Sequence, residues 1–414
     1  FPKRGVLMEI PPDVPPQGKV DLRVPPTYLF TRYAELLRNA LQREVARLRR
    51  PASALASPVL DSFYGQLGYH LGWLDAHFAP VRQHTGKLLR PTLLLLAYEA
   101  AGACETTARR DEQTHLARAL PAAVAIELYH NFTLIHDDIE DGDRERRSRP
   151  TAWAVFGLPQ ALNLGDGLAS LSRLALLALL DEGVDADLVA RLGYCFDRAA
   201  LAVIEGQHMD LCFETQTRVT VPLYLEMIRR KTAALLACAA EMGARLGCRD
   251  EPAIKALHQC GWHLGTAFQV RDDLLGIWAT RAEAGKTPAG DILRRKKTLP
   301  VLHALQQASA QDHAWLRAFY ARPEAPESEQ VDQVLSILER TRSREYCQHF
   351  LREHCLLARE ALGQVATSAV PLAQAALADL EALIEYVAAE LWPAGQEQAL
   401  PPGTKPDWRA QDNQ

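Results

Sequence analysis

The chain has 414 residues, which is enough for one large domain or two domains of ordinary size. Its composition is that of a globular protein, with 48% hydrophobic residues, 23% charged residues and a formal net charge of −5. General nucleic-acid binders are usually basic, so this charge argues against that class. The most apolar run, "LASLSRLALLALL" at residues 168–180, is interrupted by Arg173, and we expect no membrane span.

Eight cysteines are spread along the chain, and no two of them form a CxxC pair. This spacing fits neither a zinc site nor a disulfide framework. It fits reduced thiols, so we expect a cytoplasmic protein. The first residues show no secretory signal pattern.

In chain order, the sequence predicts a tail, a helical domain and a second tail. Residues 1–26 carry seven prolines and are interpreted as a tail without a core. Within residues 27–392 apolar residues recur at three-to-four spacing, as in "YAELLRNALQREVARL" and "LYLEMIRRKTAALLACAAEMGARL". This period, with many Ala and Leu residues, is typical of α-helices. Residues 393–414 have too little apolar content to fold alone. We therefore predict an all-α fold with a single large helical domain and no sheet.

The segment "HDDIEDGDRERRSRPT" at residues 136–151 places a cluster of acidic residues directly before a cluster of arginines. If the preceding helix continues to Asp141, then Asp137 and Asp141 share a face and Asp138 lies one position round. Like charges at this spacing destabilise a helix unless a cation offsets them. Mg²⁺, which binds one or two carboxylates together with substrate phosphates, suits this arrangement. A solvated helix end is the alternative, because short acidic motifs arise easily by chance.

A second acidic pair, Asp272 and Asp273 in "GTAFQVRDDLLGIW", follows another apolar helical run. Two such helices could face each other across a cavity and share metal ions, whose coordination a diphosphate would complete. Lysine and arginine side chains complement phosphate, and they occur beside the apolar helices. Each alone is an ordinary surface charge, but together they indicate a diphosphate site: Lys87, Arg90, Arg146, Arg147, Lys231, Lys286, Lys296 and Lys297.

These strings, taken in order, resemble those of the trans-isoprenyl diphosphate synthases, the polyprenyl synthetase family. Over about residues 30–392 the matching strings are "GKLLRP" (86–91), "HDDIEDGDRERRSRPT" (136–151), "ALNLGD" (161–166), "EGQHMD" (205–210), "MIRRKTAALL" (227–236), "FQVRDD" (268–273) and "GDILRRKKTLP" (290–300). The resemblance implies a helical bundle around a central cavity, a homodimer, and Mg²⁺ as cofactor, with about three ions in each active site. It implies a transferase that condenses isopentenyl diphosphate with an allylic diphosphate.

The resemblance also implies a role for each matching residue. Asp137, Asp141 and Asp272 would bind the metal, Asp138 would support them, and Lys231 would complete the catalytic set. The allylic diphosphate would be held by Arg146, Lys231, Thr232, Gln269, Lys286 and Lys296, with Gln207 and Asp210 acting through metal-bound water. Isopentenyl diphosphate would be held by Lys87, Arg90, His130 and Arg147.

Product length is expected to depend on the residues four and five positions before Asp137, which are Thr133 and Phe132. In the family an aromatic residue here acts as a floor for the growing chain. One aromatic at the deeper position, with a small residue above it, resembles the geranylgeranyl diphosphate synthases, so we expect a twenty-carbon product. Farnesyl and longer polyprenyl products are alternatives, and Phe132 could be ordinary core.

The chain departs from the family pattern at three positions. Gly276 stands where the second motif usually has a third aspartate, and we expect reduced dependence on that position rather than loss of metal binding. Ser148 replaces the usual glycine, and Trp153 stands where many members have histidine. A terpene cyclase of the same fold and a non-catalytic partner subunit are alternatives. The complete isopentenyl diphosphate set argues against the first, and the two acidic pairs argue against the second.

Overall fold

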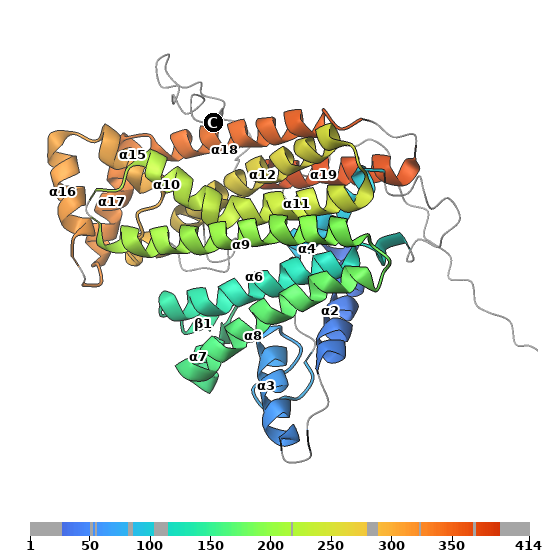
Figure 1. Ribbon diagram of the computed structural model, residues 1–414. Coiled ribbons are helices and arrows are strands. Elements are labelled where there is room, and N and C mark those ends of the chain that lie inside the picture. The colour runs from blue at the N-terminus through green and yellow to red at the C-terminus, as the bar shows by residue number, and fades with distance from the viewer. Residues whose placement is uncertain are drawn as a thin grey trace, which may run out of the picture.

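The computed structural model describes residues 27–49, 53, 56–81, 86–102, 115–216, 218–279, 289–322, 324–366 and 370–389. The two expected tails, 1–26 and 393–414, lie outside these residues, as does Lys286. The described part is almost entirely helical, as the sequence predicts (Figure 1).

The elements in chain order are α1 (Thr27–Thr31), α2 (Ala34–Leu48), α3 (Ser57–His70), α4 (Leu89–Ala100), α6 (Leu120–Glu140), β1 (Glu145–Arg146), β2 (Arg149–Pro150), α7 (Ala152–Phe156), α8 (Leu158–Leu177), η2 (Ala178–Leu180), α9 (Ala186–Thr215), α10 (Val221–Ile228), η3 (Arg229–Ala233), α11 (Ala234–Gly247), α12 (Glu251–Trp278), α14 (Gly290–Leu293), α15 (Leu299–Gln307), α16 (Ala310–Tyr320), α17 (Ser328–Arg340), α18 (Ser343–Leu362) and α19 (Pro371–Ala389).

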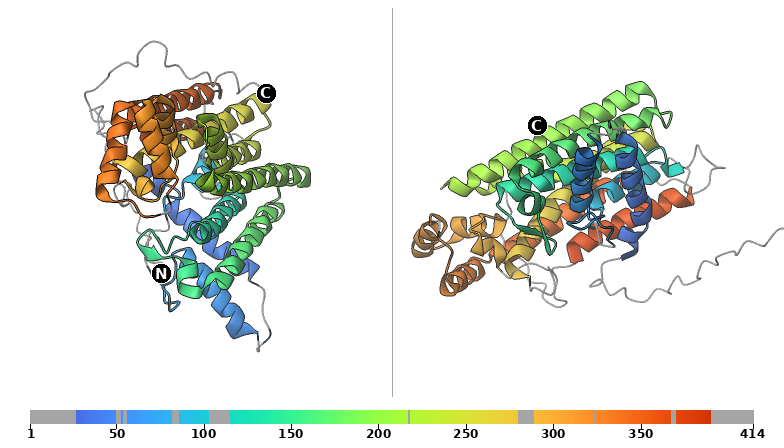
Figure 2. Two further views of the ribbon diagram at one scale, coloured as in Figure 1. Left: turned by 90° about the vertical axis from the view of Figure 1, so that its left-hand side faces the viewer. Right: turned by 90° about the horizontal axis from the view of Figure 1, so that it is seen from below.

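The long helices form a layered bundle. The helices pack in the order α8, α6, α4, α11, α12 and α18, and each one contacts the next. The shorter helices α15, α16 and α17 gather at one end, and α3 projects from the side on which α8 lies (Figures 1 and 2). One large apolar core runs through the bundle, and a smaller one lies among α14 to α17.

Small residues bring the central helices close together. Gly243 on α11 faces α4 so closely that an added Cβ would lie 2.1 Å from the carbonyl oxygen of Leu94. Helix α11 is rich in alanine, and most of its residues are buried. Close packing of backbones leaves little tolerance for added methyl groups in such a core.

A π-helical turn, η3, joins α10 to α11 and carries Lys231 and Thr232. Two glycines on neighbouring helices allow this turn to pack tightly. A Cβ on Gly206 of α9 would lie 2.3 Å from the backbone nitrogen of Lys231, and one on Gly265 of α12 would lie 2.6 Å from the Cα of Ala233. Turns of this type are frequent at functional sites, because the extra residue redirects side chains.

The expectation of no sheet is wrong in one detail, because β1 and β2 form a two-stranded antiparallel hairpin. Its turn residues, Arg147 and Ser148, have φ values of +53° and +59°. Positive φ at both central positions is the geometry of a tight hairpin turn, which glycine and asparagine adopt most easily. The strands have two residues each and a charged sequence without alternation, so no strand pattern could be recognised.

One helical stretch within the described residues, Leu158–Leu180, is long and apolar enough to cross a membrane by length and composition alone. This stretch contains the run that Arg173 interrupts, for which the sequence analysis expects no membrane span. Half of the most apolar part of this stretch is buried inside the protein, as in a helix that belongs to a core.

Candidate active site

The first acidic motif lies at the C-terminal end of α6. The helix ends at Glu140, and Asp141 is its cap, with helical backbone angles and its N–H bonded to the carbonyl of Asp137 at 2.8 Å. Asp137 and Asp141 therefore share a face, as expected. Negative charges at this end of a helix oppose its dipole, each at a cost of about 0.3–1 kcal/mol. The motif thus requires nearby cations.

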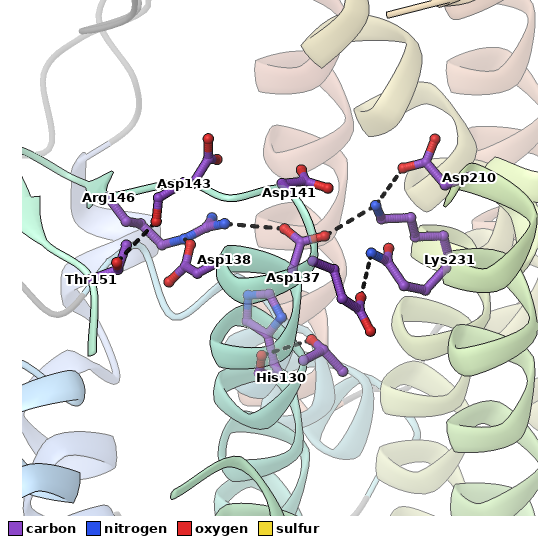
Figure 3. A network of polar contacts seen from close by, with 12 residues as sticks. His130, Asp137, Asp138, Asp141, Asp143, Arg146, Thr151, Asp210 and Lys231 are labelled. Carbon is purple, nitrogen blue, oxygen red and sulfur yellow. Dashed lines mark hydrogen bonds and ion pairs between the residues drawn. The ribbon is translucent and has the colours of Figure 1, made fainter. Parts of the chain in front are cut away.

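Three basic side chains from three separate segments meet this requirement, and Figure 3 shows two of them, Lys231 and Arg146. The Lys231 ammonium lies 3.2 Å from Asp137 and 2.6 Å from Asp210. The Arg146 guanidinium donates to Asp138 at 2.5 Å and to Asp137 at 3.1 Å. The third contact joins Lys296 to Asp141.

Lys296 follows the short helix α14 and reaches back to the first motif. Its ammonium donates to Asp141 at 3.0 Å, and its backbone N–H donates to the carbonyl of Asp291 at 2.9 Å. Lys297, its neighbour, turns the other way and donates to three carbonyls at the end of α9. Only the first of these two lysines therefore contacts the acidic motif.

The two adjacent aspartates of the first motif differ in environment. Burial acts to raise the pKa of Asp137, but Lys231 and Arg146 outweigh it, so its pKa lies below the usual range. Burial raises the pKa of Asp138 to about 6, against the opposing pull of Arg146. Asp138 is only 2% exposed and holds Arg146 in place, whereas Asp137 and Asp141 are partly exposed.

The second acidic pair is split between two environments. Asp272 on α12 is half-buried, but Asp273 is buried and accepts hydrogen bonds from the Tyr224 hydroxyl at 2.6 Å, the Gln269 amide at 3.2 Å and the Leu299 N–H at 3.3 Å. Burial, more than any other cause, raises the pKa of Asp273 to about 8. Asp273 thus joins α12 to α10 and α15, and Asp272, the member of the pair that is expected to bind metal, is the more exposed of the two.

A hydrogen bond connects the second motif to the first. The Thr232 hydroxyl donates to the Gln269 side chain at 2.8 Å, and Thr232 directly follows Lys231, which contacts Asp137. The structure therefore brings together residues from α6, η3 and α12, as the sequence predicts. Gln207 lies at the edge of this group, where its amide donates to Glu140 at 2.7 Å.

The residues expected to bind isopentenyl diphosphate lie beside the first motif. A cavity of about 900 Å³ is lined by residues that include Lys87, Asp138, Arg146 and Arg147. The Arg147 guanidinium packs on Gly86, where an added Cβ would lie 2.6 Å from it. The hairpin thus directs Arg146 to the acidic motif and Arg147 to the start of "GKLLRP".

Arg90 and His130 form a half-buried pair next to Arg147. The Arg90 guanidinium lies 2.9 Å from the Nε2 atom of His130. Burial, together with Arg90 and Arg147, holds the pKa of His130 well below its ordinary value, so the imidazole is neutral and its Nε2 accepts from Arg90. Burial lowers the pKa of Arg90 to about 10, against the opposing charge of Glu127.

Two residues near this cavity were not identified by the sequence analysis. Glu127 is buried beside Arg90, and burial raises its pKa to about 7. A glutamate inside an apolar helical run was an available signal. Tyr386 on α19 accepts a hydrogen bond from the Lys87 ammonium, and its ring centroid lies 4.9 Å from Lys87 and 4.6 Å from Arg271. Nothing in the sequence connects the C-terminal helix with Lys87.

The expected chain-length residues lie on α6 below the motif. The Phe132 ring packs between the rings of Tyr129 and His136, with distances between ring centroids of 5.1 Å and 4.7 Å. Tyr129 in turn contacts α9 through Phe196, and His136 packs on Gly165 of α8. Thr133 donates its hydroxyl to the carbonyl of His130 at 2.8 Å. Phe132 is therefore part of an aromatic cluster between α6, α8 and α9.

The donor chemistry of the site fits Mg²⁺. The partly exposed carboxylates are hard oxygen ligands, and Mg²⁺ commonly combines one or two of these with water and substrate phosphates. Within the described residues, no group of three or more His, Cys, Asp or Glu side chains is close enough to hold a metal ion. The lysines and the arginine at the motif are suited to phosphate oxygens.

Comparison with known proteins agrees with the geometry. The model of the polyprenyl synthetase family matches residues 72–338. A geranylgeranyl diphosphate synthase of Mycobacterium tuberculosis is 38% identical over 298 residues, which are 72% of this chain and 77% of that protein. A (2E,6E)-farnesyl diphosphate synthase of Mycobacterium bovis is 43% identical over 235 residues, 57% of this chain and 61% of that protein.

The fold is also that of solved structures from the same group. A polyprenyl synthetase from Streptomyces coelicolor superposes with a TM-score of 0.74 at 34% identity, covering 87% of this chain and 99% of that one. A geranylgeranyl pyrophosphate synthetase from Pyrococcus horikoshii gives a TM-score of 0.72 at 29% identity, covering 88% and 98%. The chain belongs to the polyprenyl synthetase family and is a prenyl-transferring enzyme.

Proposed function

We propose that this enzyme condenses isopentenyl diphosphate with an allylic diphosphate and releases geranylgeranyl diphosphate. The observation that carries the proposal is the β1–β2 hairpin. It directs two adjacent arginines into two neighbouring sites that are lined by basic side chains. Arg146 contacts the first acidic motif, and Arg147 packs beside Gly86 and Lys87. Two diphosphates can therefore bind side by side. A terpene cyclase, which ionises one diphosphate, has no use for the second place.

The proposed metal ligands are Asp137, Asp141 and Asp272, for about three Mg²⁺ ions. When bound, Mg²⁺ would neutralise charge that develops on the departing diphosphate. Asp138 would hold Arg146 in position, which its burial and its 2.5 Å contact support. Because Asp137 is ionised by its cationic neighbours, its carboxylate is ready to bind metal at neutral pH.

The chain's cations would hold the two substrates apart and in order. The basic side chains that pair with carboxylates in this structure, Arg146, Lys231 and Lys296, would bind the allylic diphosphate. Thr232 and Gln269 lie beside them and would also contact it. Lys286 is included because the sequence resemblance assigns it to this set. Gln207 and Asp210 would act through water. The isopentenyl diphosphate set is Lys87, Arg90, His130 and Arg147.

The reaction then needs little further chemistry from side chains. Preorganised cations around the departing diphosphate stabilise the charge that forms there. The allylic cation must meet the double bond of isopentenyl diphosphate before it meets water, so the apolar walls have to exclude solvent. The departing diphosphate is the nearest base for the final proton loss.

We also propose a homodimer in the cytoplasm. Apolar side chains that are about half exposed or more gather on the adjacent helices α8 and α9, including Leu174, Leu177, Tyr194, Leu201 and Ile204. An exposed apolar face of this kind suits a second copy of the chain.

The cytoplasmic location is supported by the cysteines. The seven described cysteines are free thiols, which suits a reducing compartment, and cell fractionation can check the location.

The metal assignment predicts that Asp137→Ala or Asp272→Ala lowers turnover at least about a hundredfold, because each removes a proposed ligand of Mg²⁺. The helical fold should persist, since removing one of several like charges does not unfold a helix. Turnover and circular dichroism measure the two effects. Asp332→Ala, at an exposed site on α17, is the control. Near-normal turnover in either variant would refute the assignment.

The pocket assignment predicts that Lys87→Ala raises the KM for isopentenyl diphosphate by about tenfold more than the KM for the allylic substrate. Tyr386→Phe should shift the same constant in the same direction by less, because it removes only the hydroxyl that Lys87 contacts. Initial-rate kinetics with each substrate varied will measure both. Equal changes in the two KM values would mean that the pockets are assigned wrongly.

The chain-length assignment predicts that Phe132→Ala shifts the product to longer chains, because it removes a steric stop from the aromatic cluster on α6. Phe132→Leu, which keeps most of the bulk, should stay close to the wild-type product. Mass spectrometry of the products measures the distribution, and farnesyl or longer products from the wild type would correct the proposed length. An active Phe132→Ala enzyme with an unchanged distribution would place the floor elsewhere.

The dimer proposal predicts that the double variant Leu201→Glu/Ile204→Glu is a monomer in sedimentation experiments while the wild type is a dimer. Both residues lie on α9, and charges there would be buried without partners in the interface. Val59→Glu on α3, at another exposed apolar position, is the control and should leave the dimer intact. A monomeric wild type would exclude the dimer.

A further inference from the structure

His70 is the last residue of α3, and it lines the cavity of about 900 Å³ beside the first acidic motif. It lies outside the sequence strings that match the family, and the family model matches only from residue 72. Neither comparison therefore gives it a role. The same cavity is lined by Lys87 and Arg147, which are proposed to bind isopentenyl diphosphate.

The end of α3 is fixed against the hairpin. The Tyr69 hydroxyl donates to the carbonyl of Pro150 on β2 at 2.8 Å, and the Cζ atom of Arg149 lies 4.2 Å from the centroid of the Tyr69 ring. Arg149 also donates to the carbonyl of Leu74 at 2.9 Å. These contacts lie on both sides of His70 in the chain, so its backbone has a defined position relative to the hairpin.

The imidazole of His70 lies among residues that are expected to contact diphosphate. Arg146 and Arg147 are close enough to act on its charge, and His70 in turn acts on His130. Its Nε2 atom is buried and has no hydrogen-bond partner within the part of the chain that the structure describes. A buried polar atom without a partner costs free energy, and a ligand that pairs with it removes this cost.

The His70 imidazole is neutral at physiological pH. Burial first, and then Arg146 and Arg147, lower its pKa to about 3, against an opposing contact with Asn131. A neutral imidazole has one N–H donor and can lie beside arginines without the repulsion that an imidazolium would cause. An anion attracted by the arginines would bring acceptor oxygens to this donor.

We propose that His70 is a further substrate-binding residue, whose Nε2–H group donates a hydrogen bond to the diphosphate of isopentenyl diphosphate. The proposal rests on the proposed function of the site. In this arrangement Lys87 and Arg147 supply charge, whereas His70 supplies direction, because an N–H donor binds best an oxygen that lies in line with it.

The test is the dissociation constant of isopentenyl diphosphate, measured by titration calorimetry without Mg²⁺ and without the allylic substrate. His70→Phe keeps a ring but removes the donor, and His70→Ala removes both, so each should weaken binding by about tenfold. His70→Gln places an amide N–H near the position of Nε2 and should bind within about threefold of the wild type. In kinetics the KM for isopentenyl diphosphate should rise in the same proportion, while the KM for the allylic substrate changes by less than about twofold.

Controls separate the possible failures. His77→Gln, at an exposed position on the loop after α3, should bind like the wild type, and thermal unfolding reports whether each variant is folded. If His70→Phe and His70→Ala bind like the wild type, or if folded His70→Gln binds no better than they do, the proposal is wrong. Equal increases of both KM values would also contradict it, because a displaced hairpin would disturb both diphosphates. A wild type that neither binds isopentenyl diphosphate nor turns over would overturn the proposed function as well.

Discussion

The carboxylates at the C-terminal end of α6 are the constraint on which the rest of the site depends. They repel one another and oppose the helix dipole, so they are stable only when cations approach. Lys231, Arg146 and Lys296 provide these cations from η3, from the hairpin and from the segment after α14. Each comes from a different part of the chain, so the site is complete only when all three segments have docked. The same cations suit a diphosphate, which joins the stability of the site to its chemistry.

Backbone geometry decides where these cations point. The π-helical turn is accommodated because Gly206 and Gly265 leave room on both sides of it. The hairpin turn at Arg147 and Ser148 has positive φ at both residues, which turns adjacent side chains in different directions. The Trp153 indole donates to the carbonyl of Asp143 at 2.8 Å and so fixes the loop before the hairpin. Ser148 and Trp153 thus depart from the family pattern within an intact turn.

The second acidic motif shows how burial separates two identical residues. Asp273 is surrounded by three hydrogen-bond donors and joins three helices, whereas Asp272 is half-buried. At Gly276 the carboxylate of Asp291, which lies on another helix, packs where a Cβ would otherwise stand.

The sequence by itself determined the helical class, the positions of the two acidic motifs and the family, because periodicity and short ordered motifs are local properties of the chain. It also placed Arg146, Lys231 and Lys296 in one group, through their resemblance to known motifs. It could not show the hairpin, since two-residue strands have no pattern, nor the different environments of Asp272 and Asp273. The contacts of Lys87 with Tyr386 and of Gly276 with Asp291 join segments that only packing brings together. Such contacts depend on the three-dimensional approach of helices, which tertiary structure alone decided.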